Sequence, residues 1–183
     1  MNIMTDDENQ NLFAKIDDVL KNVDLSTTTS EGAGFEELKP GYYLGSVDNA
    51  QICTSKSSGN PQVKVCFTVA EDGIAYNTDD AGNVEVEVLK GSKGRKIFKY
   101  YPLKDAATVK RFVSDMLKFE DQDGNSILPA EAFTTAAVLA DALDAIAGMQ
   151  VYLQLTVSGE GETKTTWTNL ISWKRAAQLE LPQ

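Results

Sequence analysis

The sequence predicts a mainly β domain with helices, because three observations point the same way. From Leu38 onward, the apolar residues alternate with polar ones in several short segments, and one central block changes to a helical period instead. Segments rich in Gly, Ser, Asn and Pro separate the alternating stretches. At 183 residues and 42% apolar, the chain can bury one sizeable core but is short for two. We therefore expect one main domain at residues 38–183 and an N-terminal arm at residues 1–37.

The arm is predicted to hold one amphipathic helix at about residues 6–23. Thr5 and Glu8 have the spacing of a capping box. Apolar residues then recur at steps of three and four: Leu12, Phe13, Ile16, Val19, Leu20 and Val23. The following LSTTTSEGAG has no periodicity, so residues 24–37 are predicted to be a flexible linker. The arm has nine acids and two bases, a net charge of −7 out of the formal −10 of the whole chain, so the body is nearly balanced.

The first two strands are predicted to form a hairpin. GYYLGSVDNAQIC (41–53) leads into the turn-rich TSKSSGNP, and QVKVCFTVA (62–70) then alternates cleanly, with Val63, Val65 and Phe67 on one face. Cys53 and Cys66 flank this turn at unequal distances, so we do not expect them to face each other. Two free thiols suit a reducing cytoplasm.

Three strands and a helical block complete the predicted domain. IAYNTDDAGNVEVEVLKGSKG (74–94) is interpreted as a long loop with a short strand or turn at VEVEV, and RKIFKYYPL (95–103) as the third strand. Asp105 can cap a helix over 105–119, and 128–148 is predicted as a second helix, with Pro129 in its first turn and Gly148 at its end. MQVYLQLTV (149–157) and TTWTNLISWKR (165–175) are the fourth and fifth strands.

This order of elements is that of an OB-fold, a five-stranded barrel with a helical insertion between strands 3 and 4. The rival is an α+β sandwich with helices on one face. The two tight hairpins and the position of the helical block favour the barrel.

The residue types present argue against catalysis. The chain has no histidine, which excludes most zinc sites and the Ser-His-Asp and Cys-His arrangements. DQDGNS (121–126) begins like a calcium loop, but Ser126 replaces the required glycine and Glu131 falls one position short of the bidentate ligand. The acid pairs Asp79–Asp80 and Glu85–Glu87 have the chemistry to bind magnesium, as in a carboxylate-metal nuclease, but a solvated acidic loop is the favoured interpretation. We expect no enzyme activity, no cofactor and no metal.

A basic, aromatic stretch points to a different function. Residues 90–111, KGSKGRKIFKYYPLKDAATVKR, hold eight lysines and arginines and one acid. Single-stranded nucleic acid needs both cations, which follow the phosphates, and flat rings, on which bases stack. In an OB-fold the groove crosses strands 2 and 3 between the loops joining strands 1–2 and 4–5. The candidate nucleic-acid-binding residues are Lys56, Lys64, Lys93, Arg95, Lys96, Phe98, Lys99, Tyr100, Tyr152, Lys164 and Trp167.

The period of two divides the third strand into two faces. Lys96, Phe98 and Tyr100 form one set, and the other set is Ile97, Lys99, Tyr101 and Leu103. We expect the first set to face the groove, because the second carries the aliphatic side chains suited to a core. The alternative is that the rings fill a small barrel and the lysines are only solvated.

Several stretches resemble phage-encoded OB-fold single-stranded DNA-binding proteins of replication and recombination modules. These stretches are ELKPGYYLGSVDNAQICTSKSSGNPQVKVCFTV, GRKIFKYYPL, VKRFVSDML and GMQVYLQLTVSGEGETKTTWTNLISWK, and the similarity spans about residues 38–175. The resemblance implies a non-catalytic protein that coats exposed single strands and presents them to replication or recombination enzymes. The cytoplasm expected from the two free thiols would then be that of the host cell, if the protein is viral.

One departure from that family concerns the termini. Many of its members end in an acidic tail that recruits partners, whereas this chain ends AAQLELPQ with a single acid. We hypothesise that the N-terminal helix binds partner proteins or a second copy instead, through Leu12, Phe13, Ile16 and Val19. The alternative function is a structural or adaptor protein of a viral assembly, with this helix as its contact. With no apolar run of 18 residues, we expect no membrane partner.

Overall fold

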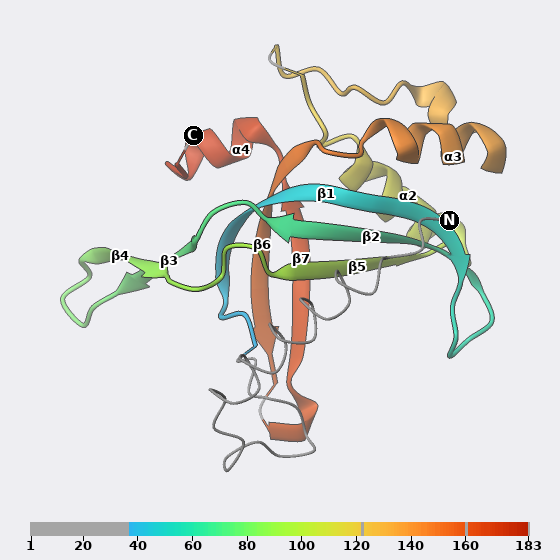
Figure 1. Cartoon of the computed structure of the whole chain (residues 1–183). Coiled ribbons are helices and arrows are strands. Elements are labelled where there is room, and N and C mark those ends of the chain that lie inside the picture. Colours follow the sequence, from blue (N-terminus) through green and yellow to red (C-terminus); the bar gives the residue numbers. More distant parts are fainter. Residues whose placement is uncertain (1–36, 122, 160, 183) are drawn as a thin grey trace, which may run out of the picture. The chain divides into compact units, whose positions relative to one another are not determined.

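The computed structural model describes residues 37–121, 123–159 and 161–182, which form a mainly β structure with one open antiparallel sheet (Figure 1). Its seven strands are β1 (Gly41–Thr54), β2 (Pro61–Val69), β3 (Gly73–Thr78), β4 (Val84–Leu89), β5 (Lys96–Pro102), β6 (Gln150–Ser158) and β7 (Thr165–Ile171). The described helices are α2 (Ala106–Met116), α3 (Ala136–Ala145) and α4 (Trp173–Gln178), with short 3-10 turns η1 (Ala130–Phe133) and η2 (Gly161–Thr163). The predicted mixture of β and α structure is confirmed, but the sheet has seven strands rather than five. The predicted helix at 6–23 and nearly all of the predicted linker lie outside the described residues.

Strand β1 joins the two parts of the sheet. It pairs with β2 along its second half and with β6 along its first, so the strand order is β4-β3-β1-β2-β5 with β6 and β7 branching from β1. Gly45 pairs with both Val69 and Val151 at this branch. A Cβ atom there would lie 2.7 Å from Cδ1 of Leu153, so a larger residue at this position would have to displace the Leu153 side chain. Figure 1 shows β6 and β7 crossing the β1–β2–β5 layer.

The segment interpreted as a long loop with a short strand or turn at VEVEV is a regular hairpin: the VEVEV strand is confirmed as β4, whereas β3 was not predicted. β3 and β4 pair without a register shift from Gly73↔Leu89 to Thr78↔Val84. One Asp79 carboxylate oxygen accepts the backbone N–H groups of Ala81 and Asn83, at 2.9 and 2.8 Å, and so closes the turn. The polar NTDDAGN run concealed the pairing, because only β4 alternates clearly in the sequence.

The main core lies between the inner face of β1, β2 and β5 and the helices. Val63, Val65 and Phe67 are fully buried, as their alternation predicted, and α2 contributes Phe112 and Met116. A second, smaller cluster consists of Tyr152, Ile171, Ala176 and Leu181, on the side of β6 covered by α4. The chain thus buries both faces of β6.

The helix caps decide where the helices begin. The Asp105 carboxylate accepts the N–H of Thr108 at 2.8 Å, and the Thr108 hydroxyl accepts the N–H of Asp105 at 3.2 Å, which confirms the predicted cap of α2. The second predicted helix is divided into η1 and α3, because Thr135 caps a new start. The last strand ends at Ile171, earlier than predicted, because Ser172 caps α4.

The two cysteines do not face each other, as predicted. Cys53 lies opposite Gln62 in the β1–β2 register, whereas Cys66 lies opposite Asn49. Both thiols are free.

Candidate nucleic-acid interface

The outer face of β2 and β5 carries the predicted pair of rings. Phe98 is 47% exposed and Tyr100 is 51% exposed, whereas Ile97 and Tyr101 on the opposite face are each 5% exposed. The predicted division of this strand is therefore confirmed, with Ile97 and Tyr101 toward the core and Phe98 and Tyr100 outward. Two neighbouring large rings left half in water on the outer face of the sheet bury only about half of their surface in the fold, so they are candidates for contact with a ligand.

Lys64 completes this arrangement from the neighbouring strand. It lies opposite Tyr100 in the β2–β5 register. Its ammonium nitrogen is 4.8 Å from the centre of the Phe98 ring and 6.0 Å from that of Tyr100. Attraction between the cation and the π faces holds the long side chain along the rings. We call Lys64, Phe98 and Tyr100 the aromatic platform.

Lys96 lies on the same outer face but is paired. Its ammonium group donates to the Asp48 carboxylate and, at 2.6 Å, to the Thr68 hydroxyl. Asp48 stands at the β-bulge between Val47 and Asn49, which brings its carboxylate to this position. The hydrogen bond from Lys96 holds the pKa of Asp48 below its usual value, and the same bond raises the pKa of Lys96. Asp48 thus neutralises one predicted phosphate ligand.

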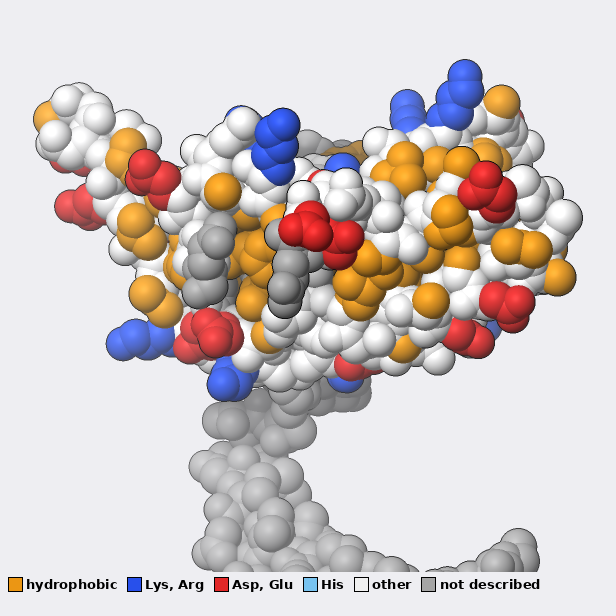
Figure 2. Space-filling view, turned by 90° about the horizontal axis from the view of Figure 1, so that it is seen from above, with side chains coloured by type: hydrophobic (Ala, Val, Ile, Leu, Met, Phe, Trp, Pro, Cys, Tyr) orange, Lys and Arg blue, Asp and Glu red, His pale blue; other side chains and the backbone are white. Residues whose placement is uncertain are grey.

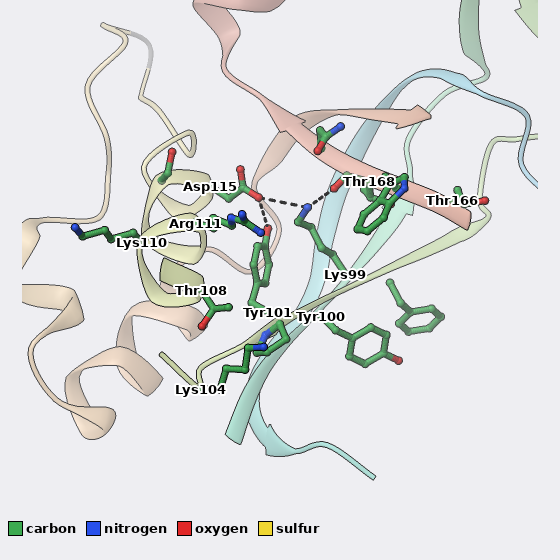
Figure 3. A pocket seen from close by; sticks show the side chains of 15 residues that line it. Lys99, Tyr100, Tyr101, Lys104, Thr108, Lys110, Arg111, Asp115, Thr166 and Thr168 are labelled. Atoms are coloured by element: carbon green, nitrogen blue, oxygen red, sulfur yellow. Dashed lines mark hydrogen bonds and ion pairs between the residues drawn. The ribbon is translucent and has the colours of Figure 1, made fainter. Parts of the chain in front are cut away.

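A cleft of about 820 Å³ adjoins the platform, between β5, α2 and β7 (Figure 3). Phe98, Tyr100 and Trp167 all line it. Trp167, on β7, is 57% exposed, and its indole N–H donates to the Ser158 hydroxyl at 2.9 Å, which fixes the orientation of the ring. The tertiary structure therefore brings three predicted stacking residues to one cleft.

The other wall of this cleft is basic. Lys104, before α2, and Lys110 and Arg111, on α2, are exposed and line the cleft. With Lys99, four cations face one acid, Asp115, among the lining residues. Sequence reasoning did not select Lys104, Lys110 and Arg111 as site residues, although they lie within the basic stretch 90–111. The signal was present, but only the predicted strand and the loop before it were assigned to a groove, and the predicted helix that follows was not.

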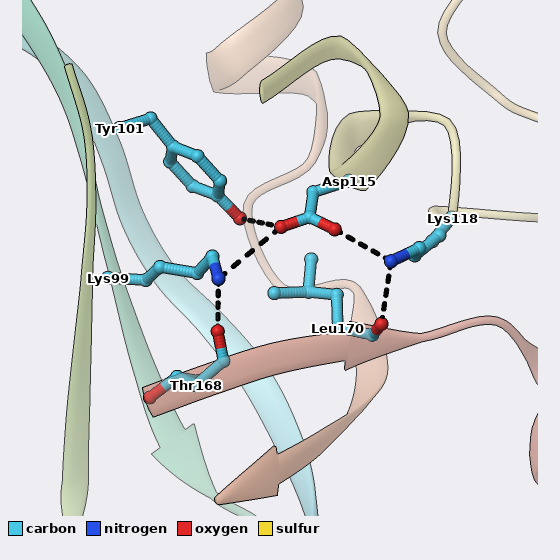
Figure 4. A network of polar contacts seen from close by, with 6 residues as sticks. All are labelled: Lys99, Tyr101, Asp115, Lys118, Thr168 and Leu170. Atoms are coloured by element: carbon cyan, nitrogen blue, oxygen red, sulfur yellow. Dashed lines mark hydrogen bonds and ion pairs between the residues drawn. The ribbon is translucent and has the colours of Figure 1, made fainter. Parts of the chain in front are cut away.

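A network of polar side chains joins β5, α2 and β7 at the end of the cleft (Figure 4). The Asp115 carboxylate accepts a hydrogen bond from the Tyr101 hydroxyl at 3.0 Å and pairs with the ammonium groups of Lys99 at 3.4 Å and Lys118 at 2.7 Å. Lys99 also donates to the carbonyl of Thr168, and Lys118 to that of Leu170 at 2.8 Å. Among the described strands β5 and β7 do not pair, so these side chains bridge the gap between them.

Lys99 is therefore not a free phosphate ligand, contrary to the expectation. Its side chain is only 17% exposed and points to the inner side of the sheet, with its ammonium 5.1 Å from the Tyr101 ring centre. Burial lowers the pKa of Lys99, although the Asp115 carboxylate opposes that shift. Burial also raises the pKa of Tyr101. Lys99 serves to hold the cleft together.

Tyr152 is a second correction, because its ring is unavailable for stacking. It is 5% exposed and packs edge-on against Trp173, at 5.4 Å between ring centres. Its hydroxyl donates to the carbonyl of Pro182. The alternation of β6 correctly placed Tyr152 on the face away from the main core, but α4 and the residues after it cover that face.

The remaining predicted cations lie in loops away from the cleft lining. Lys56 is exposed in the β1–β2 loop, and Lys164 is exposed just before β7. Lys93 and Arg95 precede β5, where the N–H of Lys93 donates to Asp72 and the carbonyl of Arg95 accepts from Val69. Their role in binding stays a prediction. The predicted partner-binding residues Leu12, Phe13, Ile16 and Val19 lie outside the described residues.

The part of the chain that the structure describes contains no group of three or more His, Cys, Asp or Glu residues placed to hold a metal ion. In the DQDGNS turn, the Asp121 carboxylate accepts the backbone N–H groups of Asp123 and Asn125, each at 2.9 Å. Nor do the described residues include a helix of the length and apolarity needed to cross a membrane.

No family model matches the sequence, and no curated protein matches it either.

Proposed function

We propose that the protein is a non-catalytic, sequence-tolerant single-stranded DNA-binding protein that acts in DNA replication or recombination. The observation that carries the proposal is the aromatic platform, in which Phe98 and Tyr100 stand half exposed on one strand with the Lys64 ammonium beside both rings. It borders a cleft whose other walls hold an exposed indole and three exposed cations.

The exposed rings and cations of this site complement the unpaired bases and the phosphates of single-stranded DNA. Every base has a π face, so stacking on Phe98, Tyr100 and Trp167 requires no particular sequence and contributes about 1–3 kcal/mol per base. The cations Lys104, Lys110 and Arg111 lie on the opposite wall, where they can contact phosphates while bases contact the rings. The body of the protein carries only a small net negative charge, so a local basic wall is not overwhelmed by the rest of that surface.

The order of strand pairing supports an OB-type fold. We propose that β1, β2, β5, β6 and β7 are the five barrel strands, since β1 pairs with β2 and β6, β2 with β5, and β6 with β7. The helices α2 and α3 then fall between the third and fourth barrel strands, and the β3–β4 hairpin is an addition between the second and third. The ligand groove of that fold crosses barrel strands 2 and 3, which correspond here to β2 and β5.

Replication or recombination enzymes are the expected protein partners, and the acidic arm at residues 1–37 is the expected contact for them. The cytoplasm is the expected location, the host cell's if the protein is viral. The partners and the host cell depend on the resemblance of the sequence to phage single-stranded DNA-binding proteins, whereas the cytoplasm is expected from the two free thiols.

Titration with poly-dT tests the function directly. In a Trp173→Phe background Trp167 is the only indole, so its fluorescence should be quenched as bases stack on it. Replacing both Phe98 and Tyr100 with alanine should weaken binding by at least about tenfold, because two stacking contacts are lost. The control is Leu117→Ala, which truncates a similarly exposed apolar side chain (41%) that does not line the cleft. Binding unaffected by the double substitution would refute the proposal.

A further inference from the structure

Strand β4 forms an open edge of the sheet. It ends the strand order β4-β3-β1-β2-β5 and pairs only with β3 among the described strands. Figure 1 shows the β3–β4 hairpin projecting from the body of the domain. The outer edge of this hairpin is therefore accessible to another strand.

One face of β4 is apolar and uncovered. Val84, Val86 and Val88 are 63, 58 and 52% exposed, and their alternation places them on the same face. The residues opposite them on β3 are Thr78, Tyr76 and Ile74. Figure 2 shows hydrophobic side chains along the projecting hairpin.

This apolar face continues the second core cluster. Ile74 and Tyr76 pack against that cluster, and the Tyr76 hydroxyl donates to the carbonyl of Leu179 at 2.8 Å, just after α4. The C-terminal segment thus covers the β3 side of the hairpin and leaves the β4 valines exposed. Three large apolar side chains in a row at the edge of a sheet mark an interaction surface.

β4 lacks several of the usual protections of an edge strand. Edge strands commonly carry charged residues, especially lysine, or a proline or a bulge, and these features hinder pairing with another strand. β4 pairs with β3 in six consecutive positions without a register shift and contains neither lysine nor proline. Its charged side chains, Glu85 and Glu87, alternate with the valines and lie on the opposite face.

We propose that β4 binds the β4 strand of a second copy of this chain, in an antiparallel pair centred on Val86. The sequence Val84-Glu85-Val86-Glu87-Val88 reads the same in both directions about Val86. A two-fold axis there places Val86 opposite its own copy and Val84 opposite Val88 of the second copy. All six valines then lie on one face of a continuous sheet, which is the self-complementarity that a symmetric interface requires.

The glutamates on the opposite face of β4 weaken this contact. The same axis places Glu85 opposite Glu87 of the second copy, and like charges directly opposite destabilise a strand pair. Glu87 is partly compensated, because it accepts from the Lys39 ammonium at 3.2 Å and from the Asn77 amide at 3.0 Å. Glu85 has no such compensation and is still repelled by Glu87 of the second copy. Because a single strand pair is also a small interface, the association is weak and depends on protein concentration.

Sedimentation velocity of the full chain without nucleic acid, over a concentration series, tests the proposal. The triple variant Val84→Thr, Val86→Thr and Val88→Thr keeps β-branched side chains but removes the apolar face, and should weaken dimerisation at least about fivefold. Glu85→Lys changes two like-charge pairs into opposite-charge pairs and should strengthen it by about three- to tenfold. Val138→Thr, at an exposed valine of α3, is the control and should change nothing.

A cross-link tests the geometry separately from the affinity. In a chain with Cys53→Ser and Cys66→Ser, a single Val86→Cys should form a disulfide-linked dimer on mild oxidation, much faster than a single Val138→Cys. A monomeric wild-type chain at high concentration, or equal cross-linking at both positions, would overturn the proposal. Dimerisation that the triple variant leaves unchanged would place the contact elsewhere and would also overturn it. None of these outcomes depends on DNA binding.

Discussion

The ammonium nitrogen of Lys64 lies 4.8 Å from the centre of the Phe98 ring, although 33 other residues separate the two in the chain. The β2–β5 pairing creates this relationship, and it places a cation and a stacking surface within the reach of one nucleotide. A base on the ring and its phosphate at the ammonium could be bound together.

Replacing Lys64 with methionine should therefore affect electrostatics more than structure. Methionine keeps the apolar stem along the rings but removes the charge, so affinity for poly-dT should fall. The slope of log K against log salt concentration should become shallower by about 0.7, the value for one phosphate contact to a single strand. Anisotropy titrations at several salt concentrations measure the slope. Lys174→Met, an exposed lysine of α4, is the control, and equal slopes for both variants would contradict the role of Lys64.

The basic wall on α2 gives a second prediction. Lys110→Glu combined with Arg111→Glu should weaken binding to all single-stranded sequences equally, since phosphate contacts carry no sequence information. The salt slope should become shallower by about 1.4 if both residues contact phosphates. Thermal unfolding should be nearly unchanged, because both side chains are exposed. An effect confined to particular sequences would show that these residues do not follow the backbone.

Asp48 is predicted to restrain binding. Asp48→Asn removes the carboxylate that pairs with Lys96 and so frees a cation on the outer face. Affinity at pH 7 should rise severalfold, and the salt slope should steepen by about 0.7. Unchanged affinity would show that Lys96 lies outside the path of the nucleic acid.

The same substitution has a pH signature. The pKa of Asp48 is lowered in the folded state, so its pairing stabilises the fold above about pH 4 and this contribution is lost as the pH falls through the folded pKa. Melting temperatures measured between pH 7 and pH 3 should fall slightly less in Asp48→Asn than in the wild type. The pair is largely exposed, so the difference should be small.

Asp115 is predicted to matter for stability. Asp115→Ala leaves the largely buried Lys99 ammonium without its carboxylate partner and removes the acceptor of the Tyr101 hydroxyl. Breaking a buried pair in this way costs about 3–5 kcal/mol, and since Asp115 is 15% exposed the cost should lie at or below the lower end of that range. Urea unfolding measures the loss. The control is Asp141→Ala, which removes an exposed acid on α3. The prediction would be contradicted if both variants lowered the free energy of unfolding by the same small amount.

Local pattern was a good guide to single strands and helix starts. The alternation in β2 and β5 identified which side chains are buried, because burial of one sheet face acts on every second residue. Asp105 and Thr108 identified the start of α2, because a cap is a contact between near neighbours. The β3 strand was missed because its outer residues, Asn77 and Thr78, are polar and exposed and leave no alternating signal.

Local sequence patterns could not predict the contacts between side chains that lie far apart in the chain. Asp48 meets Lys96 through a bulge that the sequence does not mark, and α4 covers Tyr152 with residues 173–178, the first three of which were assigned to the last strand. In both cases the partner lies at least 21 residues away in the chain, so its position depends on how the whole sheet packs.

The sequence by itself determined which residues have the chemistry for binding single strands and which side of β5 presents Phe98 and Tyr100, because side-chain direction follows from period two. Only the tertiary structure decided that Trp167 and the α2 cations meet those rings at one cleft, and that Lys99 bridges β5 to β7 instead of facing a ligand. Residue type and strand period are local properties, whereas the distance between β5, α2 and β7 is set by the burial of the common core.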